Sequence, residues 1–331
     1  AMAYNAEYGL VDPYGGKNDL KDKIIRCVGN PDTRFNEDAL RILRALRFAS
    51  VYGFSIEENT SKSIFKNADL LKNIATERVI SEFLKLICGK DAVKILDAYR
   101  ETIAVIIPEI TVMFNFNQNN IHHSYDLWQH TLTALGTIEP NPILRMTMLL
   151  HDIGKPSVKT TDNSGQSHFQ GHQLESKKIA DRILHRLRLP SDFINKTLLL
   201  IEYHDVRFNG SKKLMKKVMN VLGTDLTKQL LEVECADISA QSEYQREEKL
   251  GYLKTAKTHL NEIIKDNECF KLSQLDINGK DVLNLGVKEG RDVGNILDYL
   301  LMLVVDANVP NKKSILISKA NEYIYGNQIN K

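Results

Sequence analysis

The stretch "MLLHDIGKP" at residues 148–156 decides the fold that the sequence predicts. An apolar run ends there in His151 and Asp152, and Lys155 follows closely. A charged side chain on a buried helix is costly unless it is paired or coordinated. A His-Asp pair alone is weak evidence for a metal site, because the chain repeats it at 204–205. We therefore ask where other histidines and acids fall on apolar helices.

Four further residues occupy comparable positions. His130 lies inside the helical pattern "LWQHTLTAL", and His172 begins a helical segment. His204 ends the apolar run "LLLIEYHD", and Asp237 lies among the apolar positions of another helical segment. Because these residues fall on separate apolar helices, they could converge with the His-Asp pair inside one helical bundle.

The chemistry of this set suits divalent metal ions. Imidazole and carboxylate groups are ligands for first-row metals, and an aspartate can bridge two ions. Two ions that share a carboxylate can clamp a phosphoryl group and lower the pKa of a shared water molecule. Lys155 would add a positive charge close to a bound phosphate. The predicted metal ligands are His130, His151, Asp152, His172, His204 and Asp237.

The order and spacing of these residues resemble the ligand set of the HD superfamily of metal-dependent phosphohydrolases, including its longer, two-metal form. The resemblance implies catalytic roles for His151, Asp152 and Lys155. Mn, Ni, Co, Fe and Mg would all suit such a site. The alternative is an HD fold in which these residues only pack and form hydrogen bonds. His123 and His168 are outside candidates near the mouth of the site.

A second signal lies in "NEDALRILRALRFASVYG" at 36–53, which predicts a helix with Asn36 as its N-cap and Gly53 at its end. Arg41, Arg44 and Arg47 recur every three residues along one flank. One interpretation is a solvated face with ion pairs between residues three or four positions apart.

The other interpretation is a site that recognises nucleotides. Asp38 and Arg41 place a carboxylate acceptor and a guanidinium donor one helical turn apart. Such a pair can hydrogen-bond to the Watson–Crick edge of a base. Arg44 and Arg47 would then hold phosphates.

The chain as a whole resembles bacterial class II tRNA nucleotidyltransferases, the CCA-adding enzymes of the poly(A) polymerase family. The match rests on "DPYGGKNDL" at 12–20, Arg34, Glu37-Asp38-x-x-Arg41, "TERVISEF" at 76–83 and "ADISAQSEY" at 236–244. The resemblance implies that Asp38 and Arg41 template incoming C and A, with Arg44 and Arg47 also contacting nucleotide. The complete enzyme would use Mg with CTP or ATP and would act on the tRNA acceptor end.

The sequence departs from this family at its start. The polymerase chemistry of the family needs a Gly-Ser turn and paired carboxylates on a strand, and no such pair occurs near the beginning. We expect the chain to begin inside the family's head domain and not to polymerise alone. The alternative function is a stand-alone HD-domain phosphodiesterase or phosphatase that acts on nucleotides or RNA ends.

The predicted fold class is mainly α, with a small β remnant of the nucleotidyltransferase head at the N-terminus. The predicted domains are a head remnant at 1–28, nucleotide-recognising neck helices at 29–112, an HD domain at 113–245 and a helical tail at 246–331. We expect the tail to bind tRNA. The basic segment "NGSKKLMKK" adds Lys212, Lys213, Lys216 and Lys217 as candidate RNA contacts, although a solvated helix face explains them equally well.

Composition sets limits on the class of protein. The chain has 331 residues, of which 43% are hydrophobic and 26% charged, and its net charge is +2. These values are typical of an ordinary globular protein. The four widely spaced cysteines do not predict a disulfide scaffold. No apolar run is long enough to span a bilayer and no signal peptide is present, so we expect a cytoplasmic protein without a membrane partner.

Overall fold

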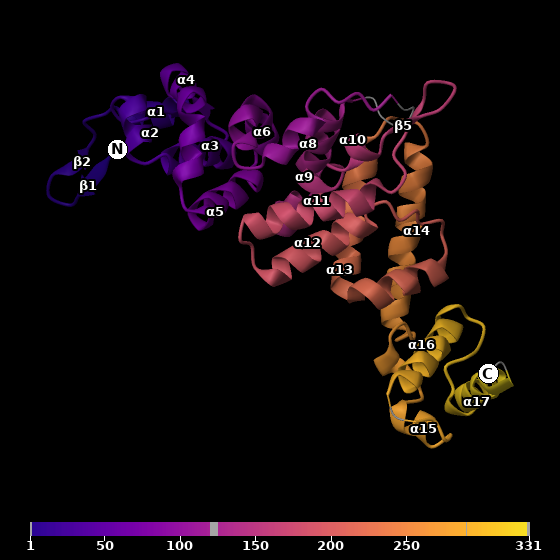
Figure 1. The fold of residues 1–331 in the computed structure, drawn as a ribbon. Coiled ribbons are helices and arrows are strands. Elements are labelled where there is room, and N and C mark those ends of the chain that lie inside the picture. Colours follow the sequence, from indigo (N-terminus) through magenta and orange to yellow (C-terminus); the bar gives the residue numbers. More distant parts are fainter. Residues whose placement is uncertain (1, 120–124, 289, 330–331) are drawn as a thin grey trace. The chain divides into compact units, whose positions relative to one another are not determined.

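The chain is built almost entirely of helices, as predicted (Figure 1). The computed structural model describes residues 2–119, 125–288 and 290–329. These form two compact units. The first unit runs to Asp205 and adds Glu232–Arg246, and the second contains Val206–Leu231 and the residues from Glu247 onward.

The few strands are short. β1 (Ala3–Asn5) pairs antiparallel with β2 (Gly9–Val11), and Tyr4 lies opposite Leu10. After α1 (Gly16–Asp22), β3 (Ile24–Ile25) pairs in parallel with β4 (Ser55–Ile56). The third pair, β5 (Thr160–Thr161) with β6 (Ser167–His168), is antiparallel.

The neck region, residues 29–112, is a group of short helices. Its elements are α2 (Pro31–Glu37), α3 (Leu40–Tyr52), α4 (Glu58–Asn67), η1 (Ala68–Asn73), α5 (Thr76–Ile87), α6 (Ala92–Ala98), α7 (Arg100–Ala104) and η2 (Pro108–Met113). Helix α3 packs on α5, and this contact fully buries Leu43 and Leu46 of α3 and Phe83 and Leu86 of α5.

The helix predicted from Asn36 is wrong at its start. Asn36 lies within α2, whose N-cap is Asn30, and the backbone leaves the helical region at Asp38 (φ −152°, ψ 100°). The Oδ1 atom of Asp38 then accepts a hydrogen bond from the Leu40 N–H at the start of α3. The predicted end is correct, since Gly53 adopts the left-handed conformation (φ 69°) that favours glycine after a helix.

The region that carries the His-Asp pair is a bundle of helices. It contains α8 (Leu127–Thr137), α9 (Pro142–Leu150), α10 (Lys155–Val158), α11 (His172–Arg186) and α12 (Ser191–Tyr203). The C-terminal part of α13 (Lys212–Ala240) completes this part of the first unit. Gly223 interrupts α13 with non-helical backbone angles.

The second unit has a core of its own. It contains the first part of α13 with α14 (Arg246–Lys265), η3 (Leu272–Gln274), α15 (Gly279–Leu283), α16 (Arg291–Val305) and α17 (Lys313–Ile329). Val282, Leu300 and Leu316 are fully buried at its centre. Residues 206–231 belong to this unit, although the sequence placed them in the HD domain; the four predicted domains as such stay a prediction.

Among the helices that the structure describes, none combines the length and the apolar composition of a bilayer-crossing segment.

Candidate functional site

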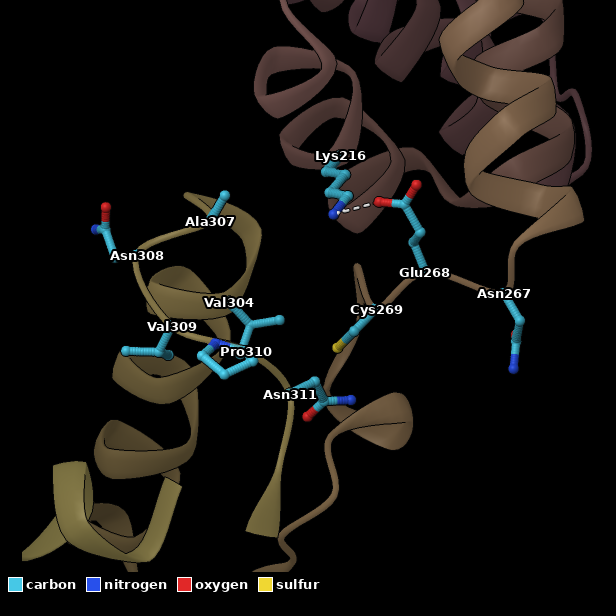
Figure 2. Close-up of a pocket in the computed structure, with 10 residues that line it drawn as sticks. All are labelled: Lys216, Asn267, Glu268, Cys269, Val304, Ala307, Asn308, Val309, Pro310 and Asn311. Atoms are coloured by element: carbon cyan, nitrogen blue, oxygen red, sulfur yellow. Dashed lines mark ion pairs between the residues drawn. The ribbon is translucent and has the colours of Figure 1, made fainter. Parts of the chain in front are cut away.

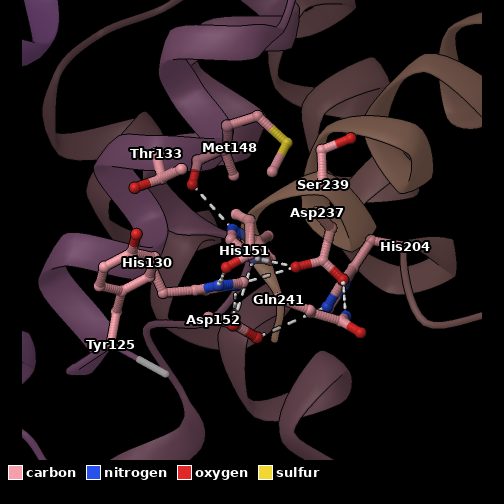
Figure 3. A network of polar contacts seen from close by, with 12 residues as sticks. Tyr125, His130, Thr133, Met148, His151, Asp152, His204, Asp237, Ser239 and Gln241 are labelled. Carbon is pink, nitrogen blue, oxygen red and sulfur yellow. Dashed lines mark hydrogen bonds and ion pairs between the residues drawn. The ribbon is translucent and has the colours of Figure 1, made fainter. Parts of the chain in front are cut away.

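The six predicted metal ligands meet at one place in the first unit, and Figure 3 shows five of them pointing toward one another. The helices position them by their ends. His151 and His204 are the C-cap residues of α9 and α12, and His172 is the first residue of α11. His130 and Asp237 project from α8 and α13, and Asp152 follows His151.

The ligand atoms fall into two groups that share Asp152. In the first, the Nε2 atoms of His130 and His151 lie 2.9 and 3.4 Å from Asp237 Oδ1, and 3.5 and 3.2 Å from Asp152 Oδ2. In the second, the Nε2 atoms of His172 and His204 lie 3.3 and 3.6 Å from Asp152 Oδ1. Each carboxylate oxygen of Asp152 therefore faces a different group.

Backbone carbonyls fix the orientation of all four imidazoles. The Nδ1 atoms of His151, His172 and His204 each donate to the carbonyl three residues earlier, at 2.8, 2.9 and 2.7 Å. His130 Nδ1 donates to the Ala240 carbonyl at 3.3 Å. Because Nδ1 of each ring is held by a carbonyl, Nε2 is the nitrogen left to bind a metal, and all four Nε2 atoms point inward.

Burial and charge make this set costly without an ion. Burial lowers the pKa of His151, but the Asp152 carboxylate outweighs it and raises the pKa to about 10. Burial raises the pKa of Asp152, but His151 and Lys155 outweigh it and hold the pKa well below its usual range. His151 Nε2 and both oxygens of Asp152 are buried and lack an aligned hydrogen-bond partner within the described ranges.

A divalent cation fits these residues, because imidazole nitrogens and carboxylate oxygens are its usual ligands and its charge would offset the two buried carboxylates. The binding of metal by the six side chains stays a prediction.

Lys155 approaches the shared carboxylate itself. Its Nζ atom lies 2.6 Å from Asp152 Oδ2 and donates to Gln118 Oε1 at 3.1 Å. The side chain is buried, with the Phe169 ring centroid 5.6 Å from the amine. The sequence predicted that this lysine lies near the site, and the structure adds that it is held against a ligand.

A glycine lets this turn lie against α11. The N–H of Gly154 donates to Ser176 Oγ at 2.9 Å. A Cβ atom at this position would lie 2.5 Å from the Ser176 backbone nitrogen and 2.8 Å from the His172 carbonyl oxygen. Gly154 is therefore needed for the close approach between Asp152 and His172.

Two residues at the site escaped the sequence analysis. Gln241 donates from Nε2 to Asp237 Oδ2 at 2.8 Å and so holds the oxygen that faces away from the histidines. Glu234 lies one helical turn before Asp237 and is 4% exposed, and its Oε1 atom has no hydrogen-bond partner among the described residues. Burial, then the charges of Asp237 and Asp205, raise the pKa of Glu234 well above its usual value. Glu234 and Gln241 lie three and four residues from Asp237, and this spacing could have indicated that they are its neighbours on the helix surface.

Of the two outside candidates, His168 does not reach the site. His168 is exposed and its Nε2 lies 2.7 Å from Asp162 Oδ2 in the β5–β6 hairpin. His123 lies outside the described residues.

In the neck region, Asp38 and Arg41 lie on the surface with other partners. Asp38 Oδ2 is 3.0 Å from Arg78 Nη2, and Arg41 Nη1 is 2.8 Å from Glu37 Oε2. Arg41 also donates to the Arg34 carbonyl at 3.0 Å. The side chains of Asp38 and Arg41 are 31% and 34% exposed, so solvent reaches both.

Arg44 and Arg47 share one buried acid. Their guanidinium nitrogens lie 3.8 and 3.0 Å from Glu82, which is 7% exposed. Arg47 also lies 4.0 Å over the Phe48 ring centroid. Its side chain is only 16% exposed, against 48% for Arg44, so Arg44 is the more accessible of the two. Glu82 lies in the "TERVISEF" motif.

The four lysines predicted to bind RNA are all paired within the second unit. The amines of Lys212 and Lys216 lie 2.5 and 2.7 Å from the carboxylate of Glu268. Lys216 and Glu268 line a pocket of about 520 Å³ beside the end of α16 (Figure 2). Lys213 and Lys217 both lie 3.1 Å from Asp306. The sequence could not reveal these partners, which follow much later in the chain. Binding of RNA by these lysines stays a prediction.

Two family models match the chain. One, described as "Probable RNA and SrmB- binding site of polymerase A", matches residues 53–114. The other, described as "tRNA nucleotidyltransferase domain 2", matches residues 172–320.

Curated relatives and solved structures agree with these matches. A "Multifunctional CCA protein" of Legionella pneumophila is 31% identical over 237 residues, which cover 66% of this chain and 56% of that protein. A "CCA-adding enzyme" of Ligilactobacillus salivarius is 28% identical and covers 98% and 69% of the two chains. The crystal structure of the Bacillus stearothermophilus CCA-adding enzyme in complex with CTP superposes with a TM-score of 0.70 at 22% identity, over 100% of this chain and 73% of that one.

Proposed function

Since the chain belongs to the tRNA nucleotidyltransferase family that contains the CCA-adding enzymes, we propose that it serves the addition of CMP and AMP to the 3′ end of tRNA. The chain spans 56% of the length of its Legionella relative, so the activity, with CTP, ATP and the tRNA acceptor end as partners, belongs to this proposal. Magnesium would accompany the nucleotide in the complete enzyme.

The proposed recognition of the base rests on the neck. Asp38 offers carboxylate oxygens and Arg41 offers guanidinium donors on the solvent side of the junction between α2 and α3. The Leu40 N–H holds Asp38 Oδ1, while Glu37 holds Arg41 from one side. A cytosine or adenine edge would replace the Arg78 contact of Asp38 and would take up donors of Arg41. Arg44 would contact phosphate, and Arg47 would support it through Glu82 and Phe48.

The second chemical centre is an HD-type metal-dependent phosphohydrolase site. The observation that carries this proposal is that Asp152 presents one oxygen to each of two ligand groups. His130, His151, Asp152 and Asp237 would hold one ion, and Asp152, His172 and His204 the other. Bound ions would supply Lewis acidity toward a phosphoryl group and lower the pKa of a water molecule.

The residues of the chain have separate tasks in that centre. The backbone carbonyls hold each imidazole with Nε2 inward, and Gln241 fixes the plane of Asp237. Lys155 offsets the charge of Asp152 and would form an ion pair with a substrate phosphate. The substrates are phosphomonoesters or phosphodiesters of nucleotides and RNA ends. A stand-alone phosphohydrolase is not favoured, because the similarity to curated relatives extends through the neck region.

The nucleotide site is tested by titrating the full chain with CTP and ATP in a calorimeter. We expect Arg41→Ala and Asp38→Ala to weaken binding at least about tenfold, the loss of one or two charge-assisted hydrogen bonds. Arg26→Ala is the matched control, since Arg26 is similarly exposed and pairs with Asp19 and Glu57. Equal affinities for all variants would remove Asp38 and Arg41 from the site.

The metal site is tested by metal analysis after dialysis against Mn²⁺, Ni²⁺ or Co²⁺, followed by hydrolysis of a 2′,3′-cyclic nucleotide. We expect up to two ions per chain, and we expect Asp152→Asn to lose both metal and hydrolysis. Asp162→Asn is the control, because Asp162 is an exposed acid that pairs with loop groups and His168 and is not one of the predicted ligands. A wild-type chain without bound metal would contradict the proposal.

A further inference from the structure

The basic residues of the second unit differ in whether their charge is already balanced. The four lysines at the start of α13 face Glu262, Glu268 or Asp306. Three lysines of α14, Lys254, Lys257 and Lys265, are exposed. In the described part of the chain no hydrogen bond or ion pair engages their amines.

These three lysines form one stripe. They are separated by three and eight residues, which places them on the same side of a helix with 3.6 residues per turn. Asn261 lies between them on this side, and it is exposed and without a side-chain hydrogen bond among the described residues. The opposite side of α14 carries the buried residues Leu253, Ala256, Leu260 and Ile263. From Lys254 to Lys265 the stripe is about 16 Å long.

We propose that the α14 stripe, Lys254, Lys257 and Lys265, is a binding surface for the sugar-phosphate backbone of RNA. The inference rests on the proposed function, because tRNA is the partner that the family acts on. A nucleic acid strand presents regularly spaced phosphates over a distance of this size, and lysine amines bind them as point charges. Asn261 adds an amide that can donate to a phosphate or a 2′-hydroxyl oxygen.

We prefer α14 over the four lysines at the start of α13, because RNA phosphates would have to break the ion pairs of those lysines before binding. A phosphate that binds Lys216 or Lys217 must compete with Glu268 or Asp306 and leaves that acid without its partner. A phosphate that binds Lys254 displaces only water and counterions. The denser cluster in the sequence is therefore the poorer RNA surface in the structure.

The test measures binding of the full chain to a tRNA that lacks its 3′ CCA, at several salt concentrations. In the triple variant Lys254→Gln, Lys257→Gln, Lys265→Gln we expect the slope of log affinity against log salt to fall by about 2 to 3, since each phosphate contact contributes about 0.7 to 0.9. We expect affinity at low salt to fall at least about tenfold.

A matched control removes the same charge elsewhere in the second unit. Lys228, Lys313 and Lys319 pair with Asp225, Asp281 and Glu322, and their triple glutamine variant should keep the slope of the wild type. Circular dichroism of both variants checks that the helices are intact. A Lys213→Gln, Lys217→Gln variant that lowers the slope while the α14 variant does not would overturn the proposal.

A gain-of-function variant tests the same surface without loss of charge. Glu247 lies seven residues before Lys254, on the same side of α14, and is exposed. Glu247→Lys should extend the stripe and raise the salt slope by about 1. An unchanged salt slope in both α14 variants would overturn the proposed RNA-binding stripe. The proposals for the nucleotide and metal sites would still stand, because they are tested without RNA. A wild-type chain that binds no tRNA also overturns it.

Discussion

At the scale of single residues, the organisation of the site comes from how each side chain is anchored. Asp152 is useful because its two oxygens face different histidine groups. Four imidazoles present Nε2 because a main-chain carbonyl takes Nδ1–H in each case. Glu234 differs from these residues, because it is a buried acid whose Oε1 atom finds neither a hydrogen bond nor an ion pair in the described part of the chain.

Glu234 predicts a pH dependence of stability. Its raised pKa means that the folded chain keeps a proton that the unfolded chain loses above the ordinary glutamate pKa. The free energy of unfolding therefore falls as pH rises, by up to about 1.4 kcal/mol per pH unit, until the folded-state pKa is reached. Glu234→Gln removes this slope, so the metal-free variant should gain stability over the wild type at pH 8 relative to pH 5.

Denaturant unfolding followed by tryptophan fluorescence measures the stability of the first unit, which contains Glu234. The single tryptophan, Trp128, is fully buried in α8 of the first unit. Glu232→Gln, at an exposed position two residues earlier on α13, is the control and should show the pH dependence of the wild type. A parallel pH profile for Glu234→Gln and the wild type would show that Glu234 is ionised in the folded chain.

At the scale of elements, helix ends bring the ligands together, and close packing sets their spacing. His151 ends α9, His172 begins α11, and Gly154 allows the turn after α9 to touch α11. Gly154→Ala should destabilise the first unit by about 1 to 3 kcal/mol through overpacking and should weaken metal binding, because Asp152 moves relative to His172.

The readouts for Gly154→Ala are the midpoint of the Trp128 transition and the affinity for Mn²⁺. Gly294→Ala is the control, since it lies within α16 and an added Cβ meets no atom within 4 Å. That substitution should leave metal affinity unchanged. Equal effects of the two substitutions would mean that the close contact of Gly154 with Ser176 and His172 does not determine stability or metal affinity.

The convergence of the six side chains was predictable from the sequence, but pairings over long distances were not. Their position on separate apolar helical segments predicted that these six residues meet, as the structure shows. The break at Asp38 was missed because "NEDALRILRALR" has an uninterrupted helical pattern. The partners of Lys216 and Arg47, Glu268 and Glu82, lie far along the chain and no local pattern indicates them.

At the scale of the whole molecule, the proposed ions would stabilise only one of two units. All six ligands lie in the first unit, together with Trp128. A ligand that binds only the folded state raises the free energy of unfolding by about 2.7 kcal/mol at one hundred times its Kd. Addition of Mn²⁺ should therefore raise the Trp128 midpoint, and a chelator should reverse the change.

This stabilisation should also depend on pH. The pKa of His151 is raised to about 10 by Asp152, so a proton must leave before the ring can bind an ion. Binding that releases protons strengthens as pH rises, and the Mn²⁺-dependent shift should be larger at pH 8 than at pH 6. Asp152→Asn should show no shift at either pH. A shift that is larger at pH 6 would contradict the assignment of these histidines as ligands.

The first unit is not a continuous piece of chain, since Val206–Leu231 belongs to the second unit and separates His204 from Asp237. During synthesis, five of the six predicted ligands are added to the chain before the last one, Asp237. No fragment that stops at Asp205 carries the complete set, and a protease cut within 206–231 would place the two parts on different polypeptides. An expression clone of the first unit must therefore extend beyond Asp237 or join its two segments through a short artificial linker.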